Sequence, residues 1–291
     1  MGKKVALALG SGGARGIAHI GVIRELIKYG FEISSISGTS MGALVGGIYA
    51  AGKLDEYESW MRSLNKRNVF NLVDFTLSTQ GIIKADRVLK EIQKFIPDRQ
   101  IEELPVRFAA VTTDIKNREE VVITKGSLFE AIRASISIPL VITPVKKNDT
   151  LFVDGGVLNP VPVNRVSRQP DDILIAVNVN AYIPYQKPSE IVSETGSVEQ
   201  LISARLTSFQ NKLESLFPTN KKESTGYLNL VGDSSNLMLS QITKLTLELN
   251  PPDLLIEISR HSCGTFDFYK AQELIDLGEK TTIECLSKWH N

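Results

Sequence analysis

Gly38-Thr39-Ser40-Met41-Gly42 lies between a short apolar stretch, 31–37, and a run of small and apolar residues, 43–52. The first stretch predicts a buried strand, and the second predicts a helix that ends at a glycine. A G-x-S-x-G pentapeptide at a turn from strand to helix can hold a serine side chain out at the edge of a sheet. Ser40 is therefore a candidate nucleophile. The alternative is that the turn only packs the helix on the strand, since glycine-rich turns commonly do no more.

Composition limits the class of protein. The chain has 291 residues, of which 42% are hydrophobic and 23% are charged, so it can bury a sizeable core. Its 33 basic and 33 acidic residues give no formal net charge, so no overall basic field favours nucleic acid as a partner. Cys263 and Cys285 lack the spacing of metal ligands, which predicts free thiols in a reducing compartment.

The sequence shows no clear signal for export or for a membrane span. The N-terminal apolar run, 5–9, is too short for the hydrophobic region of a signal peptide, and Ala6 stands where a myristoylation signal has Ser or Thr. No apolar run reaches the roughly 18 residues that a spanning helix needs. We therefore expect a cytoplasmic protein. Contact with the inner face of a membrane and homo-oligomerisation stay open.

Apolar strands and amphipathic helices alternate along most of the chain. This alternation predicts one α/β domain, 1–291, built as a three-layer α/β/α sandwich around a mostly parallel sheet. We expect strands at 5–9, 31–37, 106–113, 121–124, 151–153, 173–179 and 254–258, and helices at 17–29, 43–52, 54–64, 85–95, 128–135, 237–249 and 269–289.

Two stretches interrupt this alternation. Residues 66–81 are apolar without a clear period, which predicts an irregular cap or a covered loop. Residues 183–226 are more polar and predict an insertion. Within it, apolar residues at helical spacing favour a face packed on the same protein, with a lid, a self-association face or a membrane-surface helix as alternatives. These residues are Val198, Leu201, Ile202, Leu206, Phe209, Leu213 and Leu216.

The loop after the first predicted strand, Gly10-Ser11-Gly12-Gly13-Ala14-Arg15-Gly16, can expose successive backbone N–H groups. Acyl transfer needs such donors at the developing oxyanion, beside a nucleophile and a base. The loop could instead hold the phosphates of a dinucleotide, but Arg15 stands where that pattern needs its third glycine. Arg15 itself could lock the loop by hydrogen bonds or meet an anionic head group, and we favour the first.

Histidine is one source of a base for Ser40. His261 follows a predicted strand and comes late enough in the chain for the order Ser, Asp, His. His19 lies on the first predicted helix, where a packed or capping histidine is the simpler interpretation. His290 is the penultimate residue, where we expect the chain to fray.

Asp154 offers a different base. It ends a predicted strand and precedes Gly155 and Gly156, which would let a substrate come close. A carboxylate is intrinsically a weak base, but partial burial would raise its basicity, and direct contact with the serine hydroxyl would let the proton move during attack. The alternative is an Asp-Gly-Gly turn without a catalytic part.

Taken together, these residues resemble the motifs of the patatin-like phospholipase family, most of all its compact bacterial members. Residues 10–22 resemble the oxyanion block, and 38–42 resemble the nucleophile elbow. Ala134-Ser135-Ile136-Ser137-Ile138-Pro139 resembles the third block, and 154–162 resemble the fourth. Four blocks in family order, within residues 5 to about 180, are far more specific than any one alone.

The resemblance implies a hydrolase of carboxylic esters in phospholipids or related lipids, without metal or cofactor. It implies a Ser–Asp dyad, with Ser40 as nucleophile and Asp154 as proton acceptor, and it demotes His261. A soluble esterase or thioesterase and a non-catalytic adaptor are the alternatives. Segment 183–226 matches no family block. The other implied site residues are Gly10, Ser11, Gly12, Gly13, Ala14 and Arg15 of the oxyanion loop, Gly38, Thr39, Met41 and Gly42 of the elbow, and Gly155 and Gly156.

Overall fold

A mostly parallel sheet forms the middle of the molecule. The computed structural model describes residues 3–72, 75–78, 81–147, 149–185 and 227–289. Within these ranges the sheet has eight strands in the order β10-β9-β1-β2-β5-β8-β7, with β6 paired to β5. The parallel strands are β1 (Lys4–Leu9), β2 (Glu32–Thr39), β5 (Arg107–Asp114), β9 (Ile173–Ala181) and β10 (Leu254–Ser259); β6 (Glu119–Ile123), β7 (Val145–Lys147) and β8 (Thr150–Asp154) are antiparallel to their neighbours.

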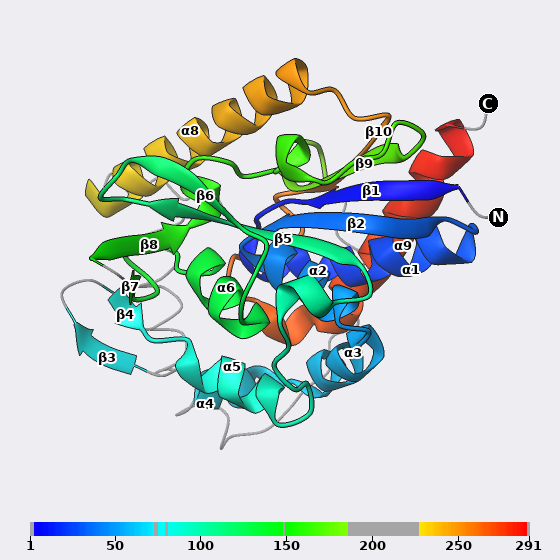
Figure 1. The fold of residues 1–291 in the computed structure, drawn as a ribbon. Helices are drawn as coiled ribbons and strands as arrows, with labels where there is room; N and C mark the ends of the chain where they lie inside the picture. The colour runs from blue at the N-terminus through cyan, green and yellow to red at the C-terminus, as the bar shows by residue number, and fades with distance from the viewer. Residues whose placement is uncertain (1–2, 73–74, 79–80, 148, 186–226, 290–291) are drawn as a thin grey trace, which may run out of the picture.

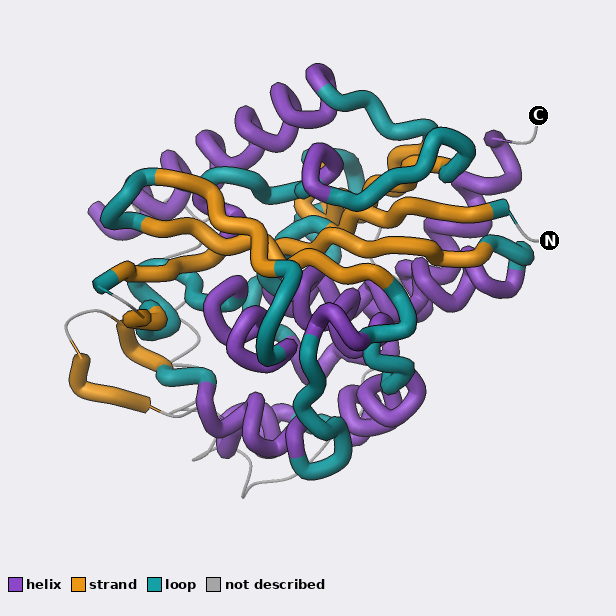
Figure 2. The backbone as a smooth tube through the Cα atoms, viewed as in Figure 1, coloured by secondary structure: helices purple, strands orange, loops and turns teal. Residues whose placement is uncertain are grey.

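Helices cover both faces of this sheet, as Figures 1 and 2 show. The three-layer arrangement expected from the sequence is thereby confirmed. One face carries α1 (Ala18–Lys28), α2 (Met41–Ala50), α6 (Leu128–Ser135) and α9 (Ala271–Trp289), with α3 (Leu54–Ser63) and α5 (Asp86–Gln93) further out; the other face carries α8 (Tyr227–Leu249). The short 3-10 helices η1 (Gly13–Ile17) and η3 (Gly155–Val157) follow β1 and β8.

The core explains why the central strands are continuous apolar runs. In β1, every residue after Lys4 is buried, as expected for a parallel strand that is covered on both sides. Leu7 and Leu9 belong to the large core beneath α1, α2 and α9. Ala8 belongs to a smaller cluster on the other face, against which Leu247 of α8 packs. The strand therefore serves two cores of very different size.

Two expectations from the sequence were wrong, and one strand of the main sheet was missed. Residues 66–81 are not irregular, because they contain α4 (Lys66–Leu72), β3 (Phe75–Ser78) and the start of β4 (Gly81–Ile83), with β3 and β4 paired as a hairpin. Helix α8 begins at Tyr227 and not at residue 237, and β7 was not predicted. Most of the predicted insertion, 186–226, with its apolar stripe, lies outside the described residues.

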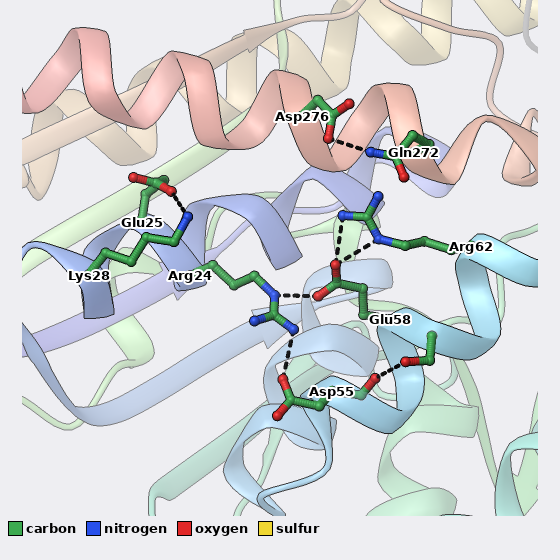
Figure 3. Close-up of polar contacts among 9 residues, drawn as sticks. Arg24, Glu25, Lys28, Asp55, Glu58, Arg62, Gln272 and Asp276 are labelled. Atoms are coloured by element: carbon green, nitrogen blue, oxygen red, sulfur yellow. Dashed lines mark hydrogen bonds and ion pairs between the residues drawn. The ribbon is translucent and has the colours of Figure 1, made fainter.

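Helix α3 is tied to α1 by a small ion-pair network (Figure 3). Arg24 of α1 donates to Glu58 and, at 2.7 Å, to Asp55. Arg62 of α3 donates to the other oxygen of Glu58 at 2.7 Å. The Glu58 side chain is 10% exposed, whereas both arginines are about one-third exposed. One buried carboxylate therefore binds two arginines that are each about one-third exposed.

We expect Glu58→Gln to lower the free energy of unfolding by about 1–2 kcal/mol, because a charge-assisted pair is lost and solvent compensates the arginines only in part. Urea unfolding followed by circular dichroism measures the change. The exposed pair of Lys53 and Glu56 provides the control. Glu56→Gln should change the stability by less than about 0.5 kcal/mol. Equal effects of the two substitutions would contradict the special place of Glu58.

Candidate active site

Ser40 lies at a sharp turn between β2 and α2. Its φ of 57° and ψ of −122° are unusual for a residue with a side chain and cost about 1–3 kcal/mol. The glycines on either side make the turn possible. A Cβ at Gly42 would lie 2.1 Å from the carbonyl oxygen of Leu9, and one at Gly38 would lie 2.4 Å from that of Gly42. The elbow expected from the pentapeptide is therefore present, and Ser40 lines a cavity at its tip.

The side chain of Ser135, the last residue of α6, is hydrogen-bonded to the backbone of this turn. The Ser40 N–H donates to Ser135 Oγ at 2.9 Å, and Ser135 Oγ donates to the carbonyl oxygen of Val111 in β5 at 2.6 Å. All of these atoms are buried. One hydroxyl thus joins the elbow, α6 and β5, a role that the sequence did not assign to Ser135 within its motif block.

We expect Ser135→Ala to lower the free energy of unfolding by about 2–4 kcal/mol, because it leaves one buried N–H and one buried carbonyl without a partner. The turnover number should also fall, since the backbone at Ser40 loses its anchor. Chemical denaturation and steady-state kinetics on the same preparations measure the two effects. Ser137, the next serine of the block, donates instead to the carbonyl oxygen of Arg133 and accepts from Arg133 Nη1 at 2.8 Å, and this guanidinium keeps further acceptors at Thr143. Ser137→Ala should lower the stability and the turnover number less than Ser135→Ala does. A larger loss in Ser137→Ala would refute the anchoring role of Ser135.

The structure brings Asp154 to the same cavity as Ser40. Asp154 ends β8 and is 5% exposed. Its Oδ1 accepts the N–H of Gly156 at 2.7 Å, whereas Oδ2 is buried and accepts no hydrogen bond of normal geometry from the described residues. Burial raises the pKa of Asp154 to about 6, and the neighbouring Ser40 side chain and the Gly156 N–H oppose that rise. The carboxylate is thus unusually basic and has one oxygen available for a proton.

The glycine loop after β1 presents backbone donors to this cavity. The N–H groups of Ser11 and Ala14 donate to carbonyl groups of other loops, each at 2.8 Å. Between them, the N–H groups of Gly12 and Gly13 form no hydrogen bond within the described part of the chain. Both glycines line the cavity with Ser40. The loop therefore has two adjacent donors that an anionic oxygen could use.

Two buried side chains hold this loop in place. Arg15 donates to Asn180 Oδ1 at 2.9 Å and to the carbonyl oxygen of Cys263 at 3.0 Å, which confirms the locking role favoured from the sequence. The ring of His19 is hydrogen-bonded to the carbonyl oxygen of Gly10 at 2.8 Å. Because a carbonyl can only accept, Nε2 carries the proton. Burial lowers the pKa of His19 to about 4, so this packed histidine is neutral at pH 7.

The structure does not bring the other candidate base to the serine. His261 is exposed, and its ring lies edge-on to Tyr182 with centres 6.5 Å apart. No interaction found among the described residues joins His261 to Ser40 or Asp154. His290 lies outside the described residues.

The cavity around Ser40 has a volume of about 760 Å³. Helix α8 supplies much of its wall, and the sequence analysis did not predict this position for it. The apolar residues of this wall are Val231, Met238, Leu239, Ile242 and Leu247. Within the described ranges, no helix combines the length and apolar character required to cross a bilayer, and no three His, Cys, Asp or Glu side chains are grouped as metal ligands would be.

Comparison with known proteins places these features in context. Residues 7–166 match the family model described as patatin-like phospholipase. An uncharacterized NTE family protein of Mycobacterium bovis is 33% identical over 328 aligned residues, which cover 97% of this chain and 91% of that protein. Lysophospholipase NTE1 of Yarrowia lipolytica is 30% identical over 188 residues, 62% of this chain and 13% of that protein. Among solved structures, VipD from Legionella pneumophila matches with a TM-score of 0.47 and 12% identity, over 99% of this chain and 67% of that chain.

Proposed function

The chain belongs to the patatin-like phospholipase family and is a lipid acyl hydrolase, and we propose that Ser40 and Asp154 carry out its reaction. The observation that supports this most directly is their placement. A buried serine on a strained turn and a buried carboxylate with a raised pKa line one cavity. No histidine among the described residues takes part in that arrangement.

The reaction begins with attack of Ser40 Oγ on the ester carbonyl carbon, while Asp154 takes the hydroxyl proton. The tetrahedral intermediate carries its negative charge on the former carbonyl oxygen. The N–H groups of Gly12 and Gly13 stabilise that oxygen, an effect worth roughly 10²–10³ in rate per well-placed donor.

Collapse of the intermediate breaks the bond to the alcohol, which leaves with the proton from Asp154. The acyl group stays on Ser40 as an ester. Water then attacks this acyl-enzyme, with Asp154 as the base, and returns the free serine and a fatty acid. One carboxylate thus serves as base, acid and base again, which suits a group whose pKa lies near 6.

We propose phospholipids and related lipids as the substrates, because the apolar wall from α8 suits an acyl chain. The name lysophospholipase, which the Yarrowia lipolytica relative carries, points to the same class. The proposal depends on the wall and the catalytic pair belonging to one cavity.

Covalent labelling tests the proposal at its centre. A fluorophosphonate probe should modify Ser40, as identified by mass spectrometry of the digested protein, and boiling the protein first should prevent the reaction. Absence of labelling on the folded protein would favour an adaptor without catalysis. Rates on one ester below and above its micelle threshold then separate the substrates. A rise at the threshold supports lipid aggregates, and no rise supports a soluble esterase or thioesterase.

A further inference from the structure

Two buried arginines line the cavity that contains Ser40 and Asp154. Arg15 lies in η1 after β1, and Arg260 directly follows β10. Their residues are 6% and 8% exposed. Burying a guanidinium is costly unless something compensates its charge. The partners of these two side chains therefore indicate what this part of the cavity can bind.

Arg15 is bound mainly by neutral groups, the Asn180 side chain and a backbone carbonyl. Burial lowers the pKa of Arg15, and the positive charge of Arg260 lowers it further, which places the two cations in each other's field. Asp267 acts in the opposite direction. This carboxylate already accepts the N–H of Gly264 at 3.0 Å and has Lys270 at 3.5 Å. Arg15 thus has no carboxylate of its own in the described part of the chain.

Arg260 is held in place but not neutralised. It donates through Nη1 to the hydroxyl of Tyr182, and its guanidinium stacks on the Tyr182 ring at 4.4 Å from the centre. Its Nε and Nη2 find no acceptor among the described residues, and no carboxylate there forms an ion pair with it. The guanidinium therefore keeps one side of its planar fork free.

Apart from the proposed base Asp154, which forms no ion pair with either arginine, three further charged side chains among the described residues line the cavity. Lys244 and Glu248 of α8 lie 3.8 Å apart and compensate each other. Glu257 of β10 also lines the cavity, but no ion pair joins it to either arginine. The cavity wall thus combines two arginines that have no carboxylate partner among the described residues with apolar side chains from α8.

We propose that Arg260 binds the phosphate of a glycerophospholipid substrate, with Arg15 adding to the positive field. This inference rests on the proposed function and adds a head-group subsite to it. A guanidinium fork matches two phosphate oxygens at once. A glycerophospholipid needs the three features that the cavity wall contains, a cation for its phosphate, an apolar surface for its acyl chain and the proposed catalytic pair for its ester.

Binding of two non-hydrolysable ether lipids with the same chain tests this subsite. The ligands are 1-O-octylglycerol 3-phosphate and 1-O-octylglycerol, titrated calorimetrically below their micelle thresholds. In the wild-type protein the phosphate should lower Kd by about 10–100-fold, the worth of a hydrogen bond to a charged group. Arg260→Gln should lose this gain. Arg107→Gln should keep this gain, because Arg107 is an exposed residue at the start of β5 and does not line the cavity.

Several outcomes would overturn the proposal. These are equal affinities of the two ligands for the wild-type protein, a gain that persists in Arg260→Gln, and inorganic phosphate alone binding as tightly as the phospholipid analogue. The last result would identify a site for free phosphate. If Arg260→Gln fails to fold, Arg260→Lys replaces it and should lose about tenfold of the gain, because the fork is gone; full retention would count against Arg260. Since neither ligand contains a carboxylic ester, the result does not depend on whether Ser40 is the nucleophile.

Discussion

Ser40→Ala is expected to reduce turnover of a p-nitrophenyl acyl ester by roughly 10⁴–10⁶-fold, because the proposed acyl-enzyme forms on the hydroxyl that this substitution removes. The free energy of unfolding should change by less than about 1 kcal/mol, since only one hydroxyl is removed from a turn that backbone contacts define. Initial rates and urea unfolding of the same preparation measure both. Activity within a factor of ten of the wild type would exclude Ser40 as the nucleophile.

Ser40→Gly is the matched control for the fold. It removes the same hydroxyl, and it also relieves the strain at a φ of 57°. We expect it to be as inactive as Ser40→Ala and more stable than it by about 1 kcal/mol. If the glycine variant were the less stable of the two, the backbone at this turn would not be strained as the structure indicates.

The part of the site that the sequence could predict is the part made by local turns. The pentapeptide around Ser40 and the triplet at Asp154 each stand at the end of a strand, and their glycines make both turns recognisable in the sequence, although Ser135 also holds the turn at Ser40. Because β2 and β5 are paired and β8 is paired with β5, these two strand ends meet at one edge of the sheet. The antiparallel pairing of β8 with β5, on which this meeting depends, was not predicted from the sequence.

The rest depends on long-range packing, which leaves no local pattern. The prediction missed the first ten residues of α8. Residues 232–236 are small or polar, so they interrupt the apolar periodicity by which a helix is recognised. Arg260 belongs to no motif. Its guanidinium stacks on the ring of Tyr182 because the two residues directly follow the paired strands β10 and β9. Ser135 could have been found, since neither of the two serines in its motif block had an assigned role.

Asp154→Asn is expected to reduce kcat/KM by about 10³–10⁴-fold at pH 8, because an amide cannot take the serine proton. The pH profile provides the more specific test. For the wild type, kcat/KM should rise about tenfold per pH unit up to an apparent pKa near 6 and then level off, since Asp154 must be ionised to act as the base. The residual activity of the variant should lack this step. A step of the same height in both proteins would assign the titration to another group.

The same substitution should stabilise the protein, and the direction follows from the two pKa values of the carboxyl. Its pKa is about 6 in the folded protein against 3.8 for the free group, so the folded state holds the proton more tightly. The free energy of unfolding therefore falls as the pH rises from about 4 to about 6 and the carboxyl loses its proton. Above pH 6 the buried charge lowers the free energy of unfolding by about 2–3 kcal/mol. Asp154→Asn removes this cost.

We therefore expect urea unfolding to show the Asp154→Asn variant about 2–3 kcal/mol more stable than the wild type at pH 8 and nearly equal to it at pH 4. His19, whose lowered pKa acts in the opposite direction over an overlapping range, is present in both proteins and cancels from the difference. A variant less stable than the wild type at pH 8 would mean that Asp154 holds the fold together. A more stable but inactive one would mean that the buried charge is kept for the reaction at the expense of stability, as expected of a base that must be desolvated to reach the serine hydroxyl.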